Sequence, residues 1–288
     1  MRIFTPSPDR PSHARPRNRM LAALPPEELA ILEPLLESIK LERRALLYDP
    51  ECRIEHVWFV ESGIVSILSV LGDGSAVETI TVGVDGMIGM PVFHGVDVTA
   101  EQAMVQAPGS GCRIPAADFR VALPSLPTLG ALLHRYAAFA FTMTAQNSAC
   151  NRKHSVEQRC ARWLLTVHDR TEGDDLGLTH DFISQMLGVR RASVTDTLAV
   201  LERHGYVATG RNRITMVDRA GLESRVCECY RIIASAYDRL LGSSSIPSPL
   251  EDVETSKGGY STVGDGTPIA ASPDGLTTGE LASAERDA

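Results

Sequence analysis

The stretch that decides the fold lies at residues 178–205 and reads LTHDFISQMLGVRRASVTDTLAVLERHG. Its first half places apolar residues at helical spacing behind Thr179, a residue type that caps helix starts: Phe182, Ile183, Met186 and Leu187. Gly188 follows, where a helix ends on a residue of positive φ. The second half has a matching apolar face: Val194, Leu198 and Leu201. We therefore predict two short amphipathic helices joined by a tight turn, the helix-turn-helix arrangement.

The second predicted helix opens with Arg190 and Arg191, and its outer face carries Arg191, Ala192, Thr195 and Asp196. In a helix-turn-helix, side chains near the start of the second helix can enter a major groove. The stretch 205–217, GYVATGRNRITMV, follows as two β-prone runs around a turn at 210–213. It predicts a hairpin whose basic tip could meet phosphate. A helical hairpin without a DNA function would fit the apolar spacing alone, but the basic residues favour DNA.

Short β-prone runs separated by glycine-containing turns fill residues 40–118, which predicts a small barrel or sandwich. The runs lie at 56–60, 64–70, 77–82, 103–107 and 112–115. A short helix is expected over 20–38, behind Pro25 and Pro26. A second helix is expected over 154–169, after the long helix described next.

The long helix is predicted from about residue 126, and it carries a heptad-like stripe. The stripe is interpreted as the seam of a homodimer, formed by Leu129, Leu133, Tyr136, Ala140, Met143, Asn147 and Cys150. Polar Gln146 and Asn147 favour this interpretation, because a plain core would take apolar residues there. The alternative is a helix that packs on its own barrel, which would show a similar stripe.

The length of 288 residues suggests about two domains. No run of about 18 apolar residues predicts a transmembrane helix, and the first ten residues lack the apolar stretch of a secretory signal. The 6 cysteines include no CxxC pair and do not form a disulfide framework. A reducing cytoplasm is therefore the expected location. Both ends, 1–19 and 243–288, have compositions typical of disordered tails.

The net charge of −8 is unevenly distributed along the chain. Residues 1–19 carry +4, residues 20–150 carry −8, residues 151–242 carry +2 and residues 243–288 carry −6. The acidic total therefore does not argue against a nucleic-acid partner for the predicted helix-turn-helix, whose own segment is slightly basic.

Taken in order, these elements resemble the Crp/Fnr family of bacterial transcription regulators. The resemblance covers about residues 20–235 and is sharpest in HVWFVESGIVSI (56–67), HSVEQRCARWLL (154–165) and MLGVRRASVTDTLAVLERHGYV (186–207). It implies an α+β chain with an N-terminal β-roll like that of cyclic-nucleotide-binding domains, a long dimerisation helix, a C-terminal winged helix-turn-helix and disordered tails. The implied boundaries are a 1–19 arm, a 20–124 β-roll, a 125–152 helix, a 153–240 DNA-binding domain and a 241–288 tail.

The resemblance also implies roles on DNA. The base-reading group would be Arg191, Ala192, Thr195 and Asp196, with Arg191 as the family's guanine-reading arginine. The phosphate-positioning group would be Thr179, Arg190, Ser193, Arg211 and Arg213. Ala192 replaces the family's base-reading glutamate and Asp196 replaces a later arginine, so the operator sequence cannot be transferred. Double-stranded DNA and a second copy of the chain are the implied partners, RNA polymerase follows from the family, and no membrane is expected.

The family's cyclic-nucleotide pocket corresponds here to Gly86, Met87, Gly89, Glu101 and Gln102. Met87 replaces a carboxylate that holds ribose, and Glu101-Gln102 stands where an Arg-Ser pair would bind the cyclic phosphate. A carboxylate repels phosphate, so cyclic AMP is not expected in the usual mode. The β-roll would then serve folding and dimerisation, or sense another molecule. A sensor module without DNA binding is a further alternative.

No cofactor and no metal site are predicted. Residues 1–51 contain no Cys, unlike the family's iron–sulfur sensors. Cys227 and Cys229 are interpreted as filler on a helix, where their side chains would point about 200° apart. Haem ligation by one of the scattered histidines is a weaker alternative. A cupin-like metal enzyme is the rival class, but it needs several converging His, and residues 40–118 contain only His56 and His94. We therefore expect no enzyme.

Overall fold

The computed structural model describes residues 16–242. The expectations for residues 1–15 and 243–288 lie outside the described residues. Within the described part, no helix is long and apolar enough to cross a membrane.

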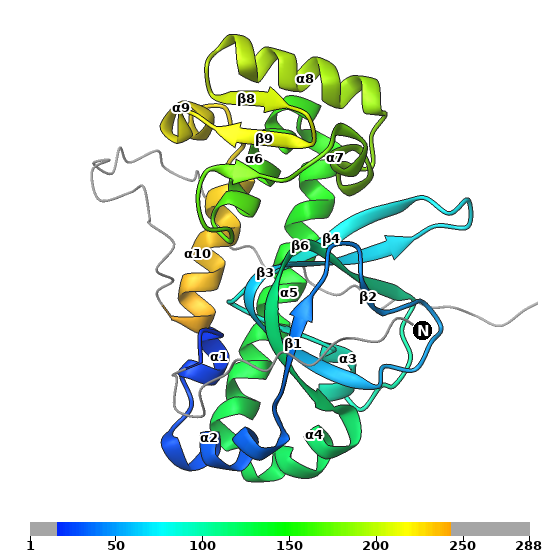
Figure 1. The fold of residues 1–288 in the computed structure, drawn as a ribbon, viewed down its shortest axis with the longest axis vertical. Coiled ribbons are helices and arrows are strands. Elements are labelled where there is room, and N and C mark those ends of the chain that lie inside the picture. Colours follow the sequence, from blue (N-terminus) through cyan, green and yellow to red (C-terminus); the bar gives the residue numbers. More distant parts are fainter. Residues whose placement is uncertain (1–15, 243–288) are drawn as a thin grey trace, which may run out of the picture. The chain divides into compact units, whose positions relative to one another are not determined.

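The N-terminal half is an antiparallel β-roll (Figure 1). Its main path runs in the order β1 (Glu37–Leu41), β6 (Glu101–Pro115), β3 (His56–Val70) and β4 (Ala76–Val82), with β2 (Leu46–Tyr48) on β6 and β5 (Met87–Ile88) on β3. The fold class predicted from the sequence, α+β with a β-roll and a C-terminal helix-turn-helix, is confirmed.

Two of the predicted strand pairs are in fact single long strands. The runs 56–60 and 64–70 join in β3, and 103–107 and 112–115 join in β6. The pairing of β3 with β6 shifts register near Gly63 but continues. Gly63 has φ +84°, and a Cβ there would lie 2.6 Å from the Ala107 carbonyl oxygen. The missing side chain lets the two backbones stay close, so an apparent turn becomes an irregularity within the strand.

The start of the chain departs from the prediction in two ways. The single helix expected over 20–38 is divided into α1 (Arg19–Ala22), α2 (Pro26–Leu32) and a 3-10 turn (Glu33–Leu35), because proline begins a helix but cannot continue one. The predicted disordered arm also ends too late. Asn18 is fully buried, caps α1, and donates through Nδ2 to the carbonyl oxygens of Val60 and Gly86.

Helices α3 (Met90–Phe93) and α4 (Ala116–Ala122) and a 3-10 turn (Leu123–Ser125) lead to the 27-residue helix α5 (Pro127–Lys153). The last helix, α10 (Cys229–Leu241), returns to pack on α5. The ring of Tyr237 in α10 meets Phe139 of α5 edge to face, with 5.2 Å between ring centroids. One core therefore joins the β-roll, α5 and the end of α10.

The dimer seam predicted on α5 requires correction, because most of its residues are buried within this chain. Five of them are at most 4% exposed: Leu129, Leu133, Tyr136, Met143 and Cys150. Ala140 is half-buried beside the β-roll, and Asn147 donates through Nδ2 to the Thr79 carbonyl oxygen at 2.8 Å. These contacts agree with the alternative interpretation, in which the helix packs on its own barrel. Amphipathic spacing identifies a buried face but not what buries it.

The C-terminal half is a winged helix-turn-helix, and its core is continuous with apolar side chains of the β-roll: Ile64, Leu68, Ala76 and Met104. It contains α6 (Val156–His168), α7 (His180–Leu187), α8 (Arg191–Arg203) and α9 (Arg219–Glu223), with a small sheet in the order β7 (Asp175–Leu176), β9 (Arg213–Met216), β8 (Val207–Gly210). The two predicted helices, the turn between them and the hairpin after them all occur. Val194, Leu198 and Leu201 face inward and are fully buried.

A buried carboxyl group links the two halves. Glu78 of β4 is 8% exposed and accepts a hydrogen bond from the Trp163 indole N–H of α6 at 2.6 Å. Burial raises the pKa of Glu78 above its ordinary value, against the lowering effect of hydrogen bonds and of nearby Arg162. The folded state therefore holds this proton more tightly than the unfolded state does, and the free energy of unfolding falls as pH rises through the raised pKa.

The variant Glu78→Gln removes the charge and keeps the hydrogen-bond acceptor. We expect it to be more stable than the wild type near pH 8, with the difference vanishing near pH 4, where the wild-type carboxyl is protonated in both states. Chemical unfolding at the two pH values measures this. A variant that is less stable than the wild type near pH 8 would show instead that an ionised Glu78 is stabilised by Arg162.

Candidate nucleic-acid interface

The turn between α7 and α8 has the geometry that the sequence predicts. Thr179 caps α7, its Oγ1 accepting the Phe182 backbone N–H at 3.1 Å. Gly188 ends α7 in the left-handed region, at φ +61°, and Arg190 is the N-cap of α8. The capping and the left-handed glycine set the angle between the helices, so they determine which face of α8 points outward.

The four predicted base-reading residues share the exposed face of α8: Arg191, Ala192, Thr195 and Asp196. Arg191 Nε lies 3.2 Å from Asp181 Oδ1, and both side chains are 67% exposed. Such an exposed ion pair contributes little to the free energy of unfolding, so Arg191 can readily exchange Asp181 for another partner. A ring nitrogen of His180 lies 3.0 Å from Thr195 Oγ1. His180 and Asp181 were missed by the sequence analysis, although their place at the start of α7 could have suggested them.

The predicted phosphate-positioning residues divide between three places. Arg190 is exposed and Ser193 is half-buried at the start of α8. Arg211 and Arg213 are exposed at the wing tip, where Asn212 has φ +57° and so closes a tight turn. Thr179 differs from these, because its hydroxyl oxygen is already occupied by the helix cap.

The wing is attached to α8 by a contact that the sequence analysis missed. Glu202 near the end of α8 accepts hydrogen bonds from the Thr209 backbone N–H at 2.8 Å and from its hydroxyl at 3.0 Å. These bonds lower the pKa of Glu202, so the carboxylate stays ionised. The recognition helix and the wing are therefore held as one surface.

The start of α8 lies beside the chain's own β-roll. A groove separates the two, and it is lined by Leu71, Gly74, Ser75, Ala76, Val77, Ser184, Gln185, Gly188, Val189, Arg190 and Ser193. A Cβ on Gly188 would lie 2.9 Å from a methyl group of Val77 in β4. Arg190 and Ser193 thus face the β3–β4 hairpin across the groove, whereas the four predicted base-reading positions remain exposed.

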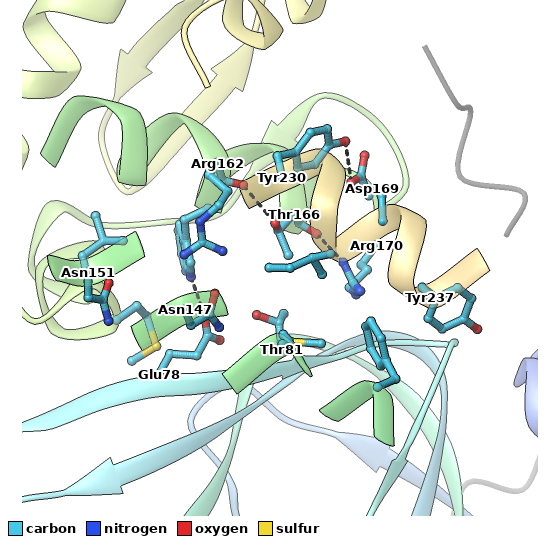
Figure 2. Close-up of a pocket in the computed structure, with 17 residues that line it drawn as sticks. Glu78, Thr81, Asn147, Asn151, Arg162, Thr166, Asp169, Arg170, Tyr230 and Tyr237 are labelled. Carbon is cyan, nitrogen blue, oxygen red and sulfur yellow. Dashed lines mark hydrogen bonds between the residues drawn. The ribbon is translucent and has the colours of Figure 1, made fainter. Parts of the chain in front are cut away.

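Buried polar side chains lie among apolar ones at the junction between β-roll and winged domain (Figure 2). Glu78 and Thr81 of β4 face Arg162 and Thr166 of α6, with Tyr230 and Tyr237 contributed by α10. Next to this junction, Arg170 Nη2 pairs with Asp85 Oδ2 at 2.7 Å, and both side chains are less than a tenth exposed. The Asp85 carboxylate acts to raise the pKa of Arg170, so the buried guanidinium stays charged although desolvation opposes it.

The predicted effector pocket is only partly assembled. Met87, Gly89 and Glu101 line a cavity of about 60 Å³ with apolar neighbours: Tyr48, Ile67, Ile80, Val82, Ile88, Met90, Pro91, Tyr136 and Ala140. Gly86 lies instead under the Tyr136 hydroxyl, and the Gln102 amide donates to Asp49 at 2.6 Å.

A cyclic nucleotide does not fit this cavity. Ligand pockets usually measure about 300–1,000 Å³, and none of the described residues that line this one is basic. Burial raises the pKa of Glu101, the single acidic group in the lining. A phosphate in this cavity would therefore meet a carboxyl group and no cation among the described lining residues.

The exposed face of α5 is opposite the predicted seam. Phe141 is 78% exposed there, the most exposed aromatic side chain among residues 16–242. The same face carries Ala131, His134, Ala138, Ala145 and Ser148, all exposed. These positions also recur at spacings of three and four, but their small and polar side chains give a weaker hydrophobic signal than the buried stripe does.

The structure places the cysteines in surroundings that the sequence did not predict. The structure brings Cys150, His154, Cys227 and Cys229 together, although no metal site was expected. Cys227 and Cys229 do not sit on one helix, because α10 begins only at Cys229. The angle of about 200° between them therefore does not apply. A hydrogen bond with Cys227 lowers the pKa of the Cys150 thiol, and Arg162 adds to this effect.

Comparison of the chain with protein-family models gives one match. Residues 158–225 match the family model of the Crp-like helix-turn-helix domain. The chain has the fold of the Crp/Fnr regulators. The resemblance recognised in the sequence is confirmed at this level. No match to the sequence was found among curated proteins.

Solved structures of several regulators are similar to this Crp/Fnr fold. FixK2 from Bradyrhizobium japonicum has a TM-score of 0.58 at 16% identity, with 67% of this chain and 98% of that chain covered. The c-di-GMP-responsive global regulator CLP from Xanthomonas campestris has 0.54 at 16%, with 66% and 98% covered. TTHB099, a CRP-family regulator from Thermus thermophilus, has 0.53 at 22%, with 65% and 95% covered. At these identities the similarity concerns the fold.

The buried pair Arg170–Asp85 predicts a clear stability effect. Arg170→Met leaves Asp85 charged and unpaired in the interior, and we expect the free energy of unfolding to fall by about 3–5 kcal/mol. Adding Asp85→Asn removes that charge and should recover part of the loss. Denaturant unfolding of both variants measures it. Equal stabilities for the single and double variants would mean that Asp85 is solvated once Arg170 is gone.

Proposed function

We propose that this chain is a sequence-specific DNA-binding transcription regulator that acts as a homodimer on a near-palindromic site. The observation that carries the proposal is the outer face of α8, where Arg191, Ala192, Thr195 and Asp196 are exposed at the start of a helix in a winged helix-turn-helix. That is the surface such domains place in a major groove. RNA polymerase is the further partner expected for a regulator of this kind, and the cytoplasm the expected location.

Arg191 is the proposed source of base choice. Its guanidinium would leave the exposed Asp181 and bind guanine O6 and N7 with two parallel hydrogen bonds. Ala192 would offer an apolar contact to a thymine methyl group, and Asp196 would accept from cytosine N4. Arg190, Ser193, Arg211 and Arg213 would hold the register through phosphates, and Thr179 would support them by fixing the start of α7.

The proposed dimer contact is the exposed face of α5 around Phe141. Ala131, Ala138 and Ala145 on this face would let two helices approach closely, and Phe141 would supply the apolar area that a stable contact needs. Two copies joined there would present two α8 helices to successive major grooves, about 34–36 Å apart.

The cavity in the β-roll limits the size of any effector that could bind there. The cavity of about 60 Å³ beside Met87 and Glu101 is too small and too apolar for a cyclic mononucleotide or dinucleotide. A signal would instead act where the winged domain meets the β-roll, by favouring one arrangement of the two. Its influence would be limited by its differential affinity for the two arrangements.

The enzyme alternative has less support. A cupin-like site needs His and carboxylate ligands inside the barrel. Among residues 16–242, the one cluster with suitable ligands lies at the end of α5, outside the β-roll. We therefore propose a regulator and not an enzyme.

Selection of bound sites from a random DNA library tests the proposal directly. With purified protein and no added ligand, we expect an enriched site with two-fold symmetry. Arg191→Ala should lose about 1–3 kcal/mol of affinity for that site and relax one base position in each half. Arg211→Ala should weaken binding to selected and random DNA alike, as a phosphate contact does.

The exposed Arg53 on the β-roll gives the matched control, and Arg53→Ala should bind as the wild type does. An equal loss on selected and random DNA for Arg191→Ala would reduce Arg191 to a phosphate contact. A library from which no sequence is enriched would contradict the proposed function itself.

The dimer surface makes a separate prediction. Phe141→Asp places a charge on the proposed contact, and we expect the dimer to dissociate into folded monomers, as light scattering after gel filtration would show. Val121 is 81% exposed on a different helix, α4, so Val121→Asp serves as the control. A dimer that withstands Phe141→Asp would place the interface elsewhere.

A further inference from the structure

Two chain segments meet at the base of the winged domain. Cys150 lies in the last turn of α5 and His154 follows the end of that helix. Cys227 and Cys229 lie where the chain leaves the winged domain and enters α10. The matched helix-turn-helix domain, residues 158–225, falls entirely between these two pairs. The four side chains thus gather where the DNA-binding domain begins and ends.

The four ligand atoms have the spacing of a single metal site. All lie within 4.8 Å of one another. Cys150 Sγ is 3.6 Å from Cys227 Sγ, and Cys229 Sγ is 3.5 Å from His154 Nδ1. Tetrahedral zinc, with bonds of about 2.3 Å to sulfur and about 2.0 Å to nitrogen, would place two sulfurs about 3.8 Å apart and a sulfur and a nitrogen about 3.5 Å apart. The Cys150–Cys227 and Cys229–His154 distances therefore match two edges of that tetrahedron.

We propose that Cys150, His154, Cys227 and Cys229 bind one zinc ion as a four-coordinate Cys₃His site. The three cysteines are at most 3% exposed, and the His154 side chain is 17% exposed. A closed set of four protein ligands of this kind is typical of structural zinc sites and leaves no position for a substrate.

The neighbouring side chains have the orientation that such a site requires. His154 Nε2 lies 3.2 Å from Glu228 Oε1, so that Nδ1 is the ring nitrogen that points to the cysteines. A ligating histidine usually donates its other ring N–H to a carboxylate in this way. The Gln146 amide donates to Cys229 Sγ at 3.1 Å, a bond that suits a thiolate.

The charged side chains around the four ligands also fit a zinc site. Three thiolates and one Zn²⁺ sum to a charge of about −1, which needs a cation nearby when it is buried. Arg159 and Arg162 of α6 are 8% and 7% exposed, and both act electrostatically on Cys150. Within residues 16–242, the Nε atom of each has no hydrogen-bond partner. Arg159 also donates to the Leu187 carbonyl oxygen and Arg162 lies near Glu78, so the thiolates would add to the compensation that these two guanidinium groups already have.

Other uses of the cluster are less favoured by the geometry. An iron–sulfur cluster inserts several atoms between its ligands and needs them further apart than 4.8 Å. A Cys150–Cys227 disulfide would explain two thiols and leave Cys229, His154 and Glu228 unexplained. A single tetrahedral ion uses all four ligands.

A bound ion would fasten the two ends of the winged domain to each other and to α5. The relation between the DNA-binding domain and the long helix would then depend on the occupancy of the site. The zinc inference itself does not rest on DNA binding, and its test needs no DNA.

Metal analysis of the full-length protein, purified in the presence of a thiol reductant, tests the inference. We expect about one zinc per chain. Replacement by Co²⁺ should give the intense visible absorption of tetrahedral, thiolate-bound cobalt. Metal removal by a chelator should lower the midpoint of thermal unfolding, and added Zn²⁺ should restore it.

The variants separate this site from adventitious binding. Cys227→Ser and Cys229→Ser should lose most of the metal, whereas His154→Cys should keep it, because four thiolates also hold zinc. Cys52→Ser is the matched control, since Cys52 is exposed on the β-roll and outside the cluster, and it should keep one equivalent. Should a serine variant fail to fold, competition between wild-type protein and a chromophoric chelator still measures the affinity.

Three results would overturn the inference. The first is wild-type protein that gains no more zinc than Cys229→Ser does. The second is iron together with acid-labile sulfide in stoichiometric amounts. The third is protein whose intact mass shows a disulfide and which remains free of metal after reduction and addition of Zn²⁺.

Discussion

The burial of one face of α5 is the constraint on which the rest of the structure depends. Leu129, Leu133, Tyr136 and Met143 enter the core of the β-roll, and Phe139 meets Tyr237 of α10. Burial of this stripe removes a large apolar area from water, which is the main favourable term in folding. Because that face is occupied, the exposed side of α5 is the opposite one, with Phe141.

The same helix positions the DNA-binding half. Its last turn leads through His154 into α6, and α10 returns along it, so the winged domain is attached to α5 at both its ends. The junction beside this attachment includes three buried polar contacts: Glu78 with Trp163, Arg170 with Asp85 and Asn147 with the Thr79 carbonyl. Polar contacts of this kind need good geometry, because each buried group loses its bonds to water on docking.

Much of the fold and part of the candidate site could be predicted because their signals are local. Thr179, Gly188 and the spacing of Val194, Leu198 and Leu201 identify two helices and their turn within a short window, and the structure has them there. The wing follows from residues 205–217 for the same reason. The ends of the strands were harder to predict. Gly63 indicates a turn in the sequence, but in the structure it allows the backbones of β3 and β6 to approach closely.

What the sequence alone determined was the type of the main elements of the winged domain and the exposed face of α8, since capping, periodicity and turn residues act over a few positions. Only the tertiary structure decided which surface buries the α5 stripe, because periodicity shows that a face is apolar and not what covers it. It also decided that Cys150 meets Cys227, 77 residues later, and that Cys227 precedes α10. Contacts between distant segments depend on how the elements pack, and no local pattern encodes that packing.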